Sequence, residues 1–369
     1  MNKRIRVLYT IPNFNTAGSG KSVYDLVQGL DNTKFDVEIC VFHNEGAFFK
    51  EVEKLGVKIH IFPFTTSYRP HISFLSRVLK IRQFFKDHQF DLIHSWHWSS
   101  DISEPLAARL AGIPFVYTKK AMGWGNRYWT WRSKLSSRVI AVNQDMIDQY
   151  FAKMPNKVIR FPLAIDTQVY KKGAISSKIM KETFCNSDDF VILSVANLVP
   201  VKGIEILIEA VKYLQDPTIK ILIVGNDQND YGKKLTLHYA ENKNIKFLGK
   251  QLEVRPYLYI ADLFVIPTKD EGRREGIPNA PLEAMACECI VVGSKVSGVT
   301  DILSAFPDYL FEAGNIEALA KKIKAVKSMS ITQRQQIAVN MRSQVVKEFS
   351  IDEFIKNHET LYIDLVKKY

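Results

Sequence analysis

Short apolar runs alternate with longer amphipathic stretches along most of the 369 residues. Apolar runs of four to eight residues predict buried strands, whereas apolar residues three and four positions apart predict helices. The strands predicted in the first half are 5–11, 35–42, 58–61, 92–94, 115–118, 139–142 and 158–160. The helices predicted between them are 22–30, 48–55, 72–87 and 104–111. This alternation is typical of βα units built around a parallel sheet.

The second half repeats the same pattern. Its predicted strands are 191–196, 219–224, 245–248, 263–267 and 290–292, and its predicted helices are 204–214, 233–242, 254–260, 281–287, 316–327 and 351–367. Between the halves the strand pattern stops at Pro162-Leu163, and a polar segment follows at 171–178. We therefore predict an α/β protein with two Rossmann-like, doubly wound domains, 1–165 and 166–350, facing across a cleft. Ligands are expected at the carboxyl ends of the strands.

The charge is concentrated in the first half. The chain carries 50 Lys and Arg against 39 Asp and Glu, a net charge of +11, of which residues 1–163 account for +10. Two stretches, Lys54–Lys86 and Arg109–Arg138, each hold seven basic residues and no acidic one. A surface of this kind attracts phospholipid headgroups, nucleic acid or a phosphorylated substrate.

Other features of the composition exclude several classes of protein. No apolar run approaches the ~18–20 residues that span a bilayer, and the N-terminal residues lack an apolar signal core. Four cysteines give no disulfide framework, so we expect a cytoplasmic protein. Cys287-x-Cys289 lacks a second pair, and the eight histidines lack ligand spacing, so we expect neither a metal nor another cofactor.

A glycine-rich segment, Gly18-Ser19-Gly20-Lys21-Ser22, follows the first predicted strand. It matches the phosphate-binding P-loop pattern only in part, because Asn15 stands where that pattern begins with glycine. One interpretation is a P-loop nucleotide hydrolase. The other is a glycine-rich turn that lets an anion approach the N-terminus of the first helix.

Two strand-to-helix segments in the second half also suggest a ligand site. Lys202-Gly203 opens a predicted helix and places an ammonium group beside backbone N–H groups, which is a favourable setting for a diphosphate. The segment 271–286 contains two glutamates, Glu275 and Glu283, separated by a helix start at Pro278 to Pro281. Spacing alone would leave both glutamates as ordinary surface residues.

The string Glu275-x7-Glu283, which continues Glu-Ala-Met-Ala, resembles family four of the retaining glycosyltransferases, which have the GT-B fold. The resemblance extends over nearly the whole chain. It includes the segments 197–203, 224–227, 245–249 and 261–267, and less specifically 91–94 and 165–166.

The resemblance implies a retaining, metal-independent transferase that takes a sugar from a nucleotide diphosphate sugar, with UDP as the expected nucleotide. The acceptor would be lipid-linked or a cell-envelope polysaccharide. By the same resemblance, residues 1–165 bind the acceptor, residues 166–350 bind the donor, and the helix 351–369 packs back on the first domain.

The resemblance also implies roles for individual residues. Glu275 and Lys202 would be catalytic, acting at the donor sugar and the leaving diphosphate, and Glu283 would bind the ribose. The other donor-binding positions are Gly18, Ser19, Gly20, Asn197, Gly276, Ile277 and Asn279. Two departures from the family pattern matter here. Asn197 stands where Arg is frequent, and Lys120 stands where a histidine is frequent. The sugar-proximal group is therefore expected at His94, His97 or Lys120.

Two segments of the first half suggest a membrane surface. In the predicted helix 72–87, apolar residues recur at helical spacing among basic ones, which is typical of an interfacial helix and equally of a core-facing helix with a basic solvent side. A second cluster combines tryptophans with basic residues: Trp124, Tyr128, Trp129, Trp131, Lys119, Lys120, Arg127, Arg132 and Lys134. We expect this domain to meet an anionic membrane at the inner face of the cell membrane, and we expect no nucleic acid, because no nucleic-acid-binding motif accompanies the patch.

Two alternatives remain open beside the transferase: the P-loop hydrolase, and a non-catalytic protein that binds sugar nucleotides. The basic surface has an alternative as well, since it would equally serve a phosphorylated acceptor in solution.

Overall fold

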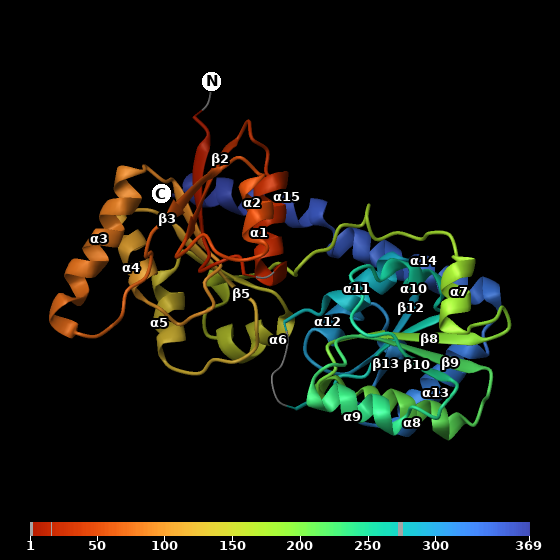
Figure 1. Cartoon of the computed structure of the whole chain (residues 1–369). Helices are drawn as coiled ribbons and strands as arrows, with labels where there is room; N and C mark the ends of the chain where they lie inside the picture. The colour runs from red at the N-terminus through yellow and green to blue at the C-terminus, as the bar shows by residue number, and fades with distance from the viewer. Residues whose placement is uncertain (1–2, 16, 272–275) are drawn as a thin grey trace. The chain divides into compact units, whose positions relative to one another are not determined.

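The computed structural model describes residues 3–15, 17–271 and 276–369. It divides into two compact units (Figure 1). Unit 1 comprises Met1–Leu163 together with Ile351–Tyr369, and unit 2 comprises Ala164–Ser350.

Unit 1 is built on a seven-stranded parallel sheet in the order β3-β2-β1-β4-β5-β6-β7. Its strands are β1 (Ile5–Thr10), β2 (Phe35–Val41), β3 (Lys58–Ile61), β4 (Leu92–Ser95), β5 (Phe115–Lys119), β6 (Arg138–Ala141) and β7 (Val158–Arg160). The helices between them are α1 (Ala17–Gly29), α2 (Phe49–Glu53), η1 (His71–Ser73), α3 (Phe74–Asp87), α4 (Ser103–Ala111), α5 (Tyr128–Leu135), α6 (Gln144–Met146), η2 (Ile147–Phe151) and η3 (Pro155–Lys157).

The last helix of the chain, α15 (Ile351–Val366), belongs to the core of unit 1. The hydroxyl of its Tyr362 lies 2.9 Å from the Tyr9 hydroxyl and 2.6 Å from Nδ1 of His94. All three side chains are fully buried. A buried polar group is costly unless it is hydrogen-bonded, so this network fixes α15 to β1 and β4 in one register.

Unit 2 is built on a six-stranded parallel sheet in the order β10-β9-β8-β11-β12-β13. Its strands are β8 (Phe190–Val195), β9 (Ile219–Val224), β10 (Ile245–Phe247), β11 (Leu263–Ile266), β12 (Ile290–Ser294) and β13 (Leu310–Phe311). Its helices are α7 (Ser177–Thr183), η4 (Pro200–Lys202), α8 (Ile204–Leu214), α9 (Asp230–His238), α10 (Arg255–Ile260), α11 (Asn279–Ala286), α12 (Val299–Ile302), η5 (Pro307–Tyr309), α13 (Ile316–Lys327) and α14 (Ile331–Glu348).

The chain passes between the units twice, after Leu163 and after Ser350. The residues next to these two passages pair with each other: the backbone N–H of Ile165 donates to the carbonyl of Phe349 at 2.9 Å, and Ile165 forms a parallel bridge with Ser350. Two segments that are far apart in sequence thus lie side by side in unit 2.

The predicted parallel α/β architecture is confirmed. Every predicted strand is present, and its ends differ from the prediction by no more than two residues. The short strand β13 and the 18-residue helix α14 were not predicted. In the described part of the chain, no helix has the length and apolar character needed to cross a membrane.

Candidate functional site

A pocket of about 170 Å³ lies at the carboxyl edge of the sheet of unit 2. Its lining residues come from the ends of β8 and β11, from η4, and from the start of α11: Ser194, Val195, Ala196, Lys202, Ile266, Pro267, Thr268, Pro278, Asn279 and Ala280. Parallel α/β sheets bind ligands at this edge, because the loops there connect strands to helix N-termini.

The chemistry of this pocket favours an anion. Lys202 lines it and brings a positive charge, and α11 begins at Asn279 on the pocket wall. The first N–H groups of a helix have no partner within the helix, and the helix dipole makes this end positive. A cation and a helix N-terminus in one small pocket match a phosphate or diphosphate.

Close backbone packing shapes the pocket. Gly203 has a φ of +64°, and a Cβ placed there would lie 2.2 Å from the carbonyl oxygen of Pro267. At Gly225, after β9, a Cβ would lie 1.9 Å from the carbonyl oxygen of Ala196. Neither approach leaves room for a side chain, so both glycines let the loops after β8, β9 and β11 meet at the pocket.

Side chains outside the predicted set hold these loops. The amide of Asn229 donates to the carbonyl of Leu198 at 2.8 Å and caps α9 by accepting from the N–H of Gly232. The backbone N–H of Lys269 donates to the carbonyl of Val201 at 2.8 Å, and its ammonium pairs with Glu205 at 2.6 Å. The N-cap pattern of Asn229 was readable from the sequence, but the pairing of Lys269 with Glu205, 64 positions earlier, was not.

Glu283 lies on α11, one turn beyond the residues that line the pocket, and is half-buried. Burial raises the pKa of its carboxyl group, and a hydrogen bond from the Tyr170 hydroxyl opposes that rise. The carbonyl of Tyr170 accepts from Arg342 of α14 at 3.1 Å, and the carbonyl of Thr167 accepts from the same guanidinium at 3.3 Å. The segment after Leu163 is thereby held against the helix that carries Glu283.

The remaining predicted residues of unit 2 fall in different settings. Asn197 is exposed in the loop after β8, and Gly276 and Ile277 are buried just before α11. Asn279 is exposed and lines the same pocket as Lys202. Glu275 lies outside the described residues.

Unit 1 places polar side chains at the carboxyl edge of its own sheet. Lys120 follows β5, and its ammonium donates to the carbonyl of Trp96 at 2.6 Å while lying 5.4 and 5.2 Å from the ring centroids of Trp96 and Trp98. Burial, together with the charges of Arg132 and Lys119, lowers the pKa of Lys120 to about 7. Burial lowers the pKa of Lys119 to about 8. In the described chain, neither lysine forms an ion pair with a carboxylate.

His97 lies near these lysines and is half-buried. Its ring shares a hydrogen bond with Ser99 at 3.1 Å and packs edge-on against Phe42 and Phe64. Burial and the nearby charges of Arg132 and Lys120 lower the pKa of His97 to about 3, so the ring is neutral at physiological pH.

His94 has a different position from the one expected. Its side chain is fully buried, with Nδ1 bonded to Tyr362 and Nε2 bonded to Thr118 at 2.8 Å. Both ring nitrogens are therefore occupied inside the core, and no atom of this ring is left for a sugar. The expectation that His94 lies near the sugar is therefore wrong. When a strand is buried on both faces, its sequence does not show which face each side chain occupies.

A buried ion pair supports this edge of unit 1. Arg132 and Glu104 are both fully buried and lie 3.0 Å apart, and Glu104 also accepts from Ser95 at 2.8 Å and from Thr10. Arg132 had been grouped with surface cations in the tryptophan-rich cluster, and the structure places it in the core instead. The sequence gives no signal for this pair, because its partners lie 28 positions apart on different helices.

The glycine-rich segment is helical. Gly18, Ser19 and Gly20 lie in the first turn of α1 rather than in a loop before it. The Lys21 ammonium pairs with Asp25 one turn later in the same helix. A P-loop lysine instead points into the loop that holds the phosphates, so this geometry does not favour the hydrolase interpretation.

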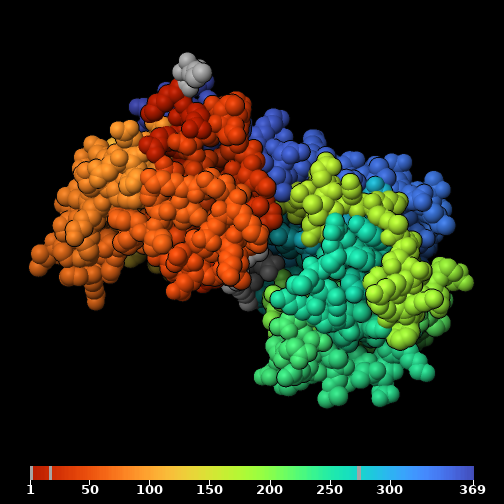
Figure 2. All heavy atoms as spheres, turned by 45° about the horizontal axis from the view of Figure 1, so that its top comes forward, coloured from red at the N-terminus to blue at the C-terminus, as the bar shows by residue number. Residues whose placement is uncertain are grey.

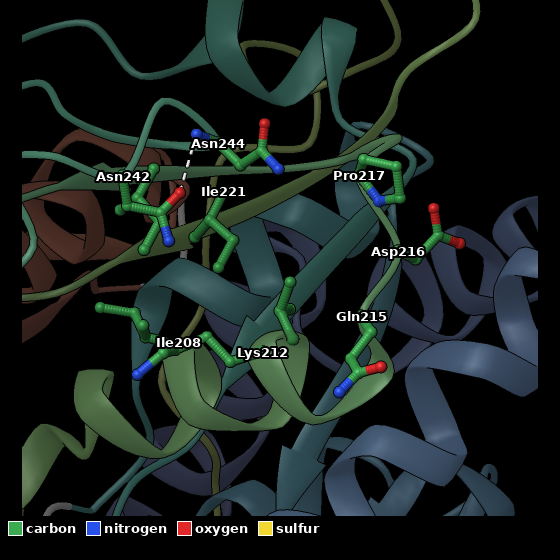
Figure 3. Close-up of a pocket in the computed structure, with 10 residues that line it drawn as sticks. Ile208, Lys212, Gln215, Asp216, Pro217, Ile221, Asn242 and Asn244 are labelled. Atoms are coloured by element: carbon green, nitrogen blue, oxygen red, sulfur yellow. Dashed lines mark hydrogen bonds between the residues drawn. The ribbon is translucent and has the colours of Figure 1, made fainter.

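A larger hollow, of about 380 Å³, lies at the opposite edge of the sheet of unit 2, where β9 and β10 begin (Figure 3). Its polar side chains are bonded within the protein: Asn242 accepts from the N–H of Asn244 at 2.9 Å, Asn244 accepts from Lys220 at 2.6 Å, and Lys212 pairs with Glu209 at 2.9 Å. The smaller pocket is the better ligand site, because Lys202 and the N-terminus of α11 both attract an anion there. Within the residues described, no group of three or more His, Cys, Asp or Glu side chains is arranged to hold a metal ion.

Comparisons with known proteins agree with this geometry. Residues 16–169 match the family described as Glycosyltransferase Family 4, and residues 176–344 match Glycosyl transferases group 1. The capsular polysaccharide biosynthesis glycosyltransferase CapH of Staphylococcus aureus is 25% identical over 93% of this chain and 98% of its own.

Two further proteins are similar over most of their length. A UDP-Gal:alpha-D-GlcNAc-diphosphoundecaprenol alpha-1,3-galactosyltransferase of Escherichia coli is 24% identical over 79% of this chain and 80% of its own. Anabaena Alr3699/HepE, whose crystal structure contains UDP and glucose, superposes with a TM-score of 0.73 at 21% identity over 97% of this chain and 99% of its own. The chain therefore belongs to glycosyltransferase family 4, with the GT-B fold.

Proposed function

We propose that this protein is a retaining glycosyltransferase that moves a sugar from a UDP-sugar to a lipid-linked or cell-envelope polysaccharide acceptor. The observation that carries the proposal is the pocket formed by Lys202 and the N-terminus of α11 at the carboxyl edge of unit 2. The names of two relatives support the substrates: CapH acts in capsular polysaccharide biosynthesis, and the E. coli enzyme uses UDP-Gal and a diphosphoundecaprenol-linked acceptor.

The chemistry assigned to the pocket is charge stabilisation. As the bond between the anomeric carbon and the diphosphate breaks, negative charge grows on the leaving oxygen, and Lys202 and the N–H groups of Asn279 and Ala280 stabilise it there. The acceptor hydroxyl forms the new bond on the same face of the sugar and gives its proton to the leaving phosphate oxygen. This step needs no metal, since the lysine and the helix end supply the positive charge.

Other residues bind and orient the substrates in this proposal. Glu275 contacts donor-sugar hydroxyls, and Glu283 accepts hydrogen bonds from the ribose in the orientation set by Tyr170. Asn197, Gly276 and Ile277 contribute contacts near the donor.

Unit 1 contributes the rest of the substrate contacts. The N-terminus of α1 at Gly18, Ser19 and Gly20 meets the donor phosphates. Lys120 and His97 at the carboxyl edge of unit 1 lie near the sugar or the acceptor. The same unit is proposed to meet an anionic membrane from the cytoplasmic side.

The first test is a panel of nucleotide sugars screened by thermal shift, because a bound ligand raises the apparent stability by mass action. UDP and at least one UDP-sugar are expected to raise the melting temperature, whereas ATP is not. A larger shift with ATP would favour a nucleotide hydrolase, and binding of UDP-sugars without any turnover would favour a non-catalytic binder.

Turnover then tests the assigned roles. Glu275→Gln is expected to lower the rate by ~10²–10³, whereas Glu283→Gln is expected mainly to raise the KM for the donor, because the ribose is remote from the reacting carbon. Proton NMR of the early product should show the anomeric configuration of the donor, and excess chelator should leave the rate unchanged. Inversion, or a strict need for added Mg²⁺ or Mn²⁺, would contradict the proposal.

A further inference from the structure

The short helix η1 and helix α3 carry exposed apolar side chains as well as buried ones. Val78, Ile81 and Phe85 are buried in unit 1, as expected of a helix that covers a sheet. On a second side of this segment, Ile72 of η1 is fully exposed, and Leu75 and Leu79 of α3 are 56% and 42% exposed. Folding of unit 1 explains the first face and gives no reason for the second.

The exposed apolar residues form one continuous patch. Leu75 and Leu79 fall one turn apart on the same side of α3, and Ile72 lies in η1 directly before them. Tyr68, 47% exposed, packs its ring 4.5 Å from that of His71 in η1. We call Tyr68, Ile72, Leu75 and Leu79 the apolar face. Figure 2 shows the orange segment that includes η1 and α3 at the surface of unit 1. Contiguous exposed apolar patches on soluble proteins mark sites of protein or membrane interaction.

The cations around the apolar face divide into two groups. Arg77 is structural, since its guanidinium donates to Thr66 Oγ1 and to the carbonyl of Ser67, each at 2.8 Å. Arg82 is structural as well, because it donates to the carbonyl of Leu110 at 3.0 Å.

The second group is available to a ligand. Arg69, Lys80 and Lys86 are exposed, and none of them forms an ion pair with another described residue. No acidic residue occurs from Lys54 to Lys86, and the first one after this stretch is Asp87 at the end of α3. The charge along η1 and α3 is therefore mainly positive.

The second acid-free stretch meets the first in the structure. The ring of Tyr68 lies 5.7 Å from that of Tyr128 at the start of α5. Trp131 follows one turn later, more than half exposed, with the Lys134 ammonium 5.5 Å from its ring centroid. Tryptophan and tyrosine beside lysine are enriched at the headgroup level of bilayers, where one end of the side chain is apolar and the other is hydrated.

We propose that the apolar face inserts into the headgroup region of an anionic bilayer, while Arg69, Lys80 and Lys86 bind lipid phosphates. Apolar insertion and electrostatic attraction together are what bind an interfacial helix to a membrane. The occupant is a membrane rather than a protein because the unpaired positive charges and the interfacial aromatics surround the apolar residues. The inference deepens the proposed function by naming where the transferase meets the surface that presents a lipid-linked acceptor.

The test uses the full-length protein and sedimentation with vesicles of phosphatidylglycerol and phosphatidylcholine. The wild type is expected to bind phosphatidylglycerol vesicles in low salt and to be released largely at 1 M salt, where the Debye length falls to ~3 Å. Changing Arg69, Lys80 and Lys86 together to Gln should weaken the binding roughly a hundredfold, since each basic residue near the surface contributes about fivefold.

The apolar contribution is tested by changing Ile72, Leu75 and Leu79 together to Ser, which should weaken the binding to phosphatidylglycerol vesicles at least tenfold in low salt. Matched controls come from unit 2: Leu237→Ser with Leu252→Ser removes exposed leucines, and Lys233→Gln, Lys234→Gln and Lys321→Gln remove exposed lysines. These controls should bind vesicles like the wild type.

Two measurements separate the possible failures. Thermal shift with UDP, which reports on unit 2, should be the same in every variant, so that a loss of vesicle binding is not a loss of folding or of donor binding. Equal binding of the apolar-face variant and the wild type would overturn the proposal. A dimer of the wild type that the apolar-face variant cannot form, without vesicle binding, would assign this face to a second copy of the chain instead.

Discussion

At the scale of single residues, burial shifts the pKa of ionisable groups at the carboxyl edges of the two sheets. Lys119 ends β5 in unit 1 and Lys120 follows it, and Glu283 lies behind the pocket of unit 2. Ligand-binding sites are where such perturbed groups collect, because desolvation strengthens every charge interaction there. These lysines have indole rings and carbonyl groups as neighbours in place of carboxylates.

Lys202→Ala tests the charge assigned to the pocket of unit 2. The rate of UDP release is expected to fall ~10²–10³-fold, because the variant loses a charge contact that is strongest in the transition state. Lys233→Ala, on the exposed side of α9, is the control and should keep the wild-type rate. Near-normal turnover of Lys202→Ala, with an unchanged melting temperature, would remove Lys202 from the site.

The lysines of unit 1 predict a pH dependence of stability. Their pKa values are about 7 and 8 in the folded protein and near 10.4 in the unfolded chain, so unfolding takes up protons between these values. The unfolding free energy should therefore rise with pH from about 7 upward, by at most about 1.4 kcal/mol per pH unit for each amine, and should not change on this account below pH 7.

Tryptophan fluorescence measures this effect in the right unit, because all five tryptophans (Trp96, Trp98, Trp124, Trp129 and Trp131) lie in unit 1. Urea unfolding followed by that signal from pH 6 to 9 should show the rise in the wild type. The variant Lys119→Met/Lys120→Met should lose most of it, whereas Lys233→Met/Lys234→Met should keep it. If the unfolding free energy rises equally with pH in all three proteins, Lys119 and Lys120 are not the cause of the rise.

The residue scale is also where sequence reasoning was least complete. Lys202 and Asn279 were predictable as pocket residues, because a strand end followed by a helix start places them at the carboxyl edge. The position of His94 was predicted wrongly because both faces of its central strand are buried. Such a strand has no alternation of apolar and polar residues from which its orientation could be predicted. The pair of Glu104 with Arg132 was not predictable at all, since its geometry exists only after the helices have packed.

At the scale of elements, prediction succeeded where the apolar pattern is strong. The central strands are short runs of buried apolar residues, and α8, α13 and α15 each have one continuous apolar face. Both patterns indicate the type and the approximate length of the element. Helix α14 was missed because its 18 residues are mostly polar and it buries only a narrow stripe around Met341 and Val345. Helix α5 was not predicted either, because its tryptophans were interpreted as part of a surface cluster.

The turn before α8 gives a prediction about an element boundary. Gly203→Ala should destabilise unit 2 and weaken UDP binding, because the position has a φ of +64° and the new Cβ would meet the carbonyl of Pro267. Gly112→Ala, at the end of α4, has a φ of +75° and open space around it, so it should cost only the left-handed backbone term of ~1–2 kcal/mol.

Calorimetry and UDP titration distinguish these two variants. Gly112→Ala should lower the stability reported by tryptophan fluorescence and leave UDP binding unchanged. Gly203→Ala should weaken UDP binding and leave the stability reported by tryptophan fluorescence unchanged. If the two glycine variants bind UDP equally well, the close approach at Gly203 does not shape the pocket.

At the scale of the whole molecule, the first unit is not continuous in sequence. Its core includes Tyr362 of α15 as well as Tyr9 and His94, and Ile355 of the same helix lies against Gly29 of α1. A fragment that ends near residue 165 therefore lacks part of its own core, and a membrane-binding test on such a fragment would measure a partly unfolded surface.

Removal of residues 351–369 should accordingly unfold unit 1 while unit 2 keeps its fold. The expected result is a red shift of tryptophan emission, because Trp96 is fully buried in the intact protein, together with retained UDP binding by thermal shift. The milder variant Tyr362→Phe should lower the midpoint of the tryptophan transition without abolishing it. Native emission from the truncated chain would show that α15 is dispensable for unit 1.

The order in which a ribosome makes this chain follows the same layout. Residues 1–163 emerge first, yet the helix that completes their core is synthesised only after residues 164–350, which hold every strand of their own sheet. The second unit can thus finish folding during translation, while the first keeps part of its apolar core exposed until residues 351–369 have been made. A message truncated before the codons for residues 351–369 would therefore yield a folded second unit joined to a first unit that lacks its closing helix.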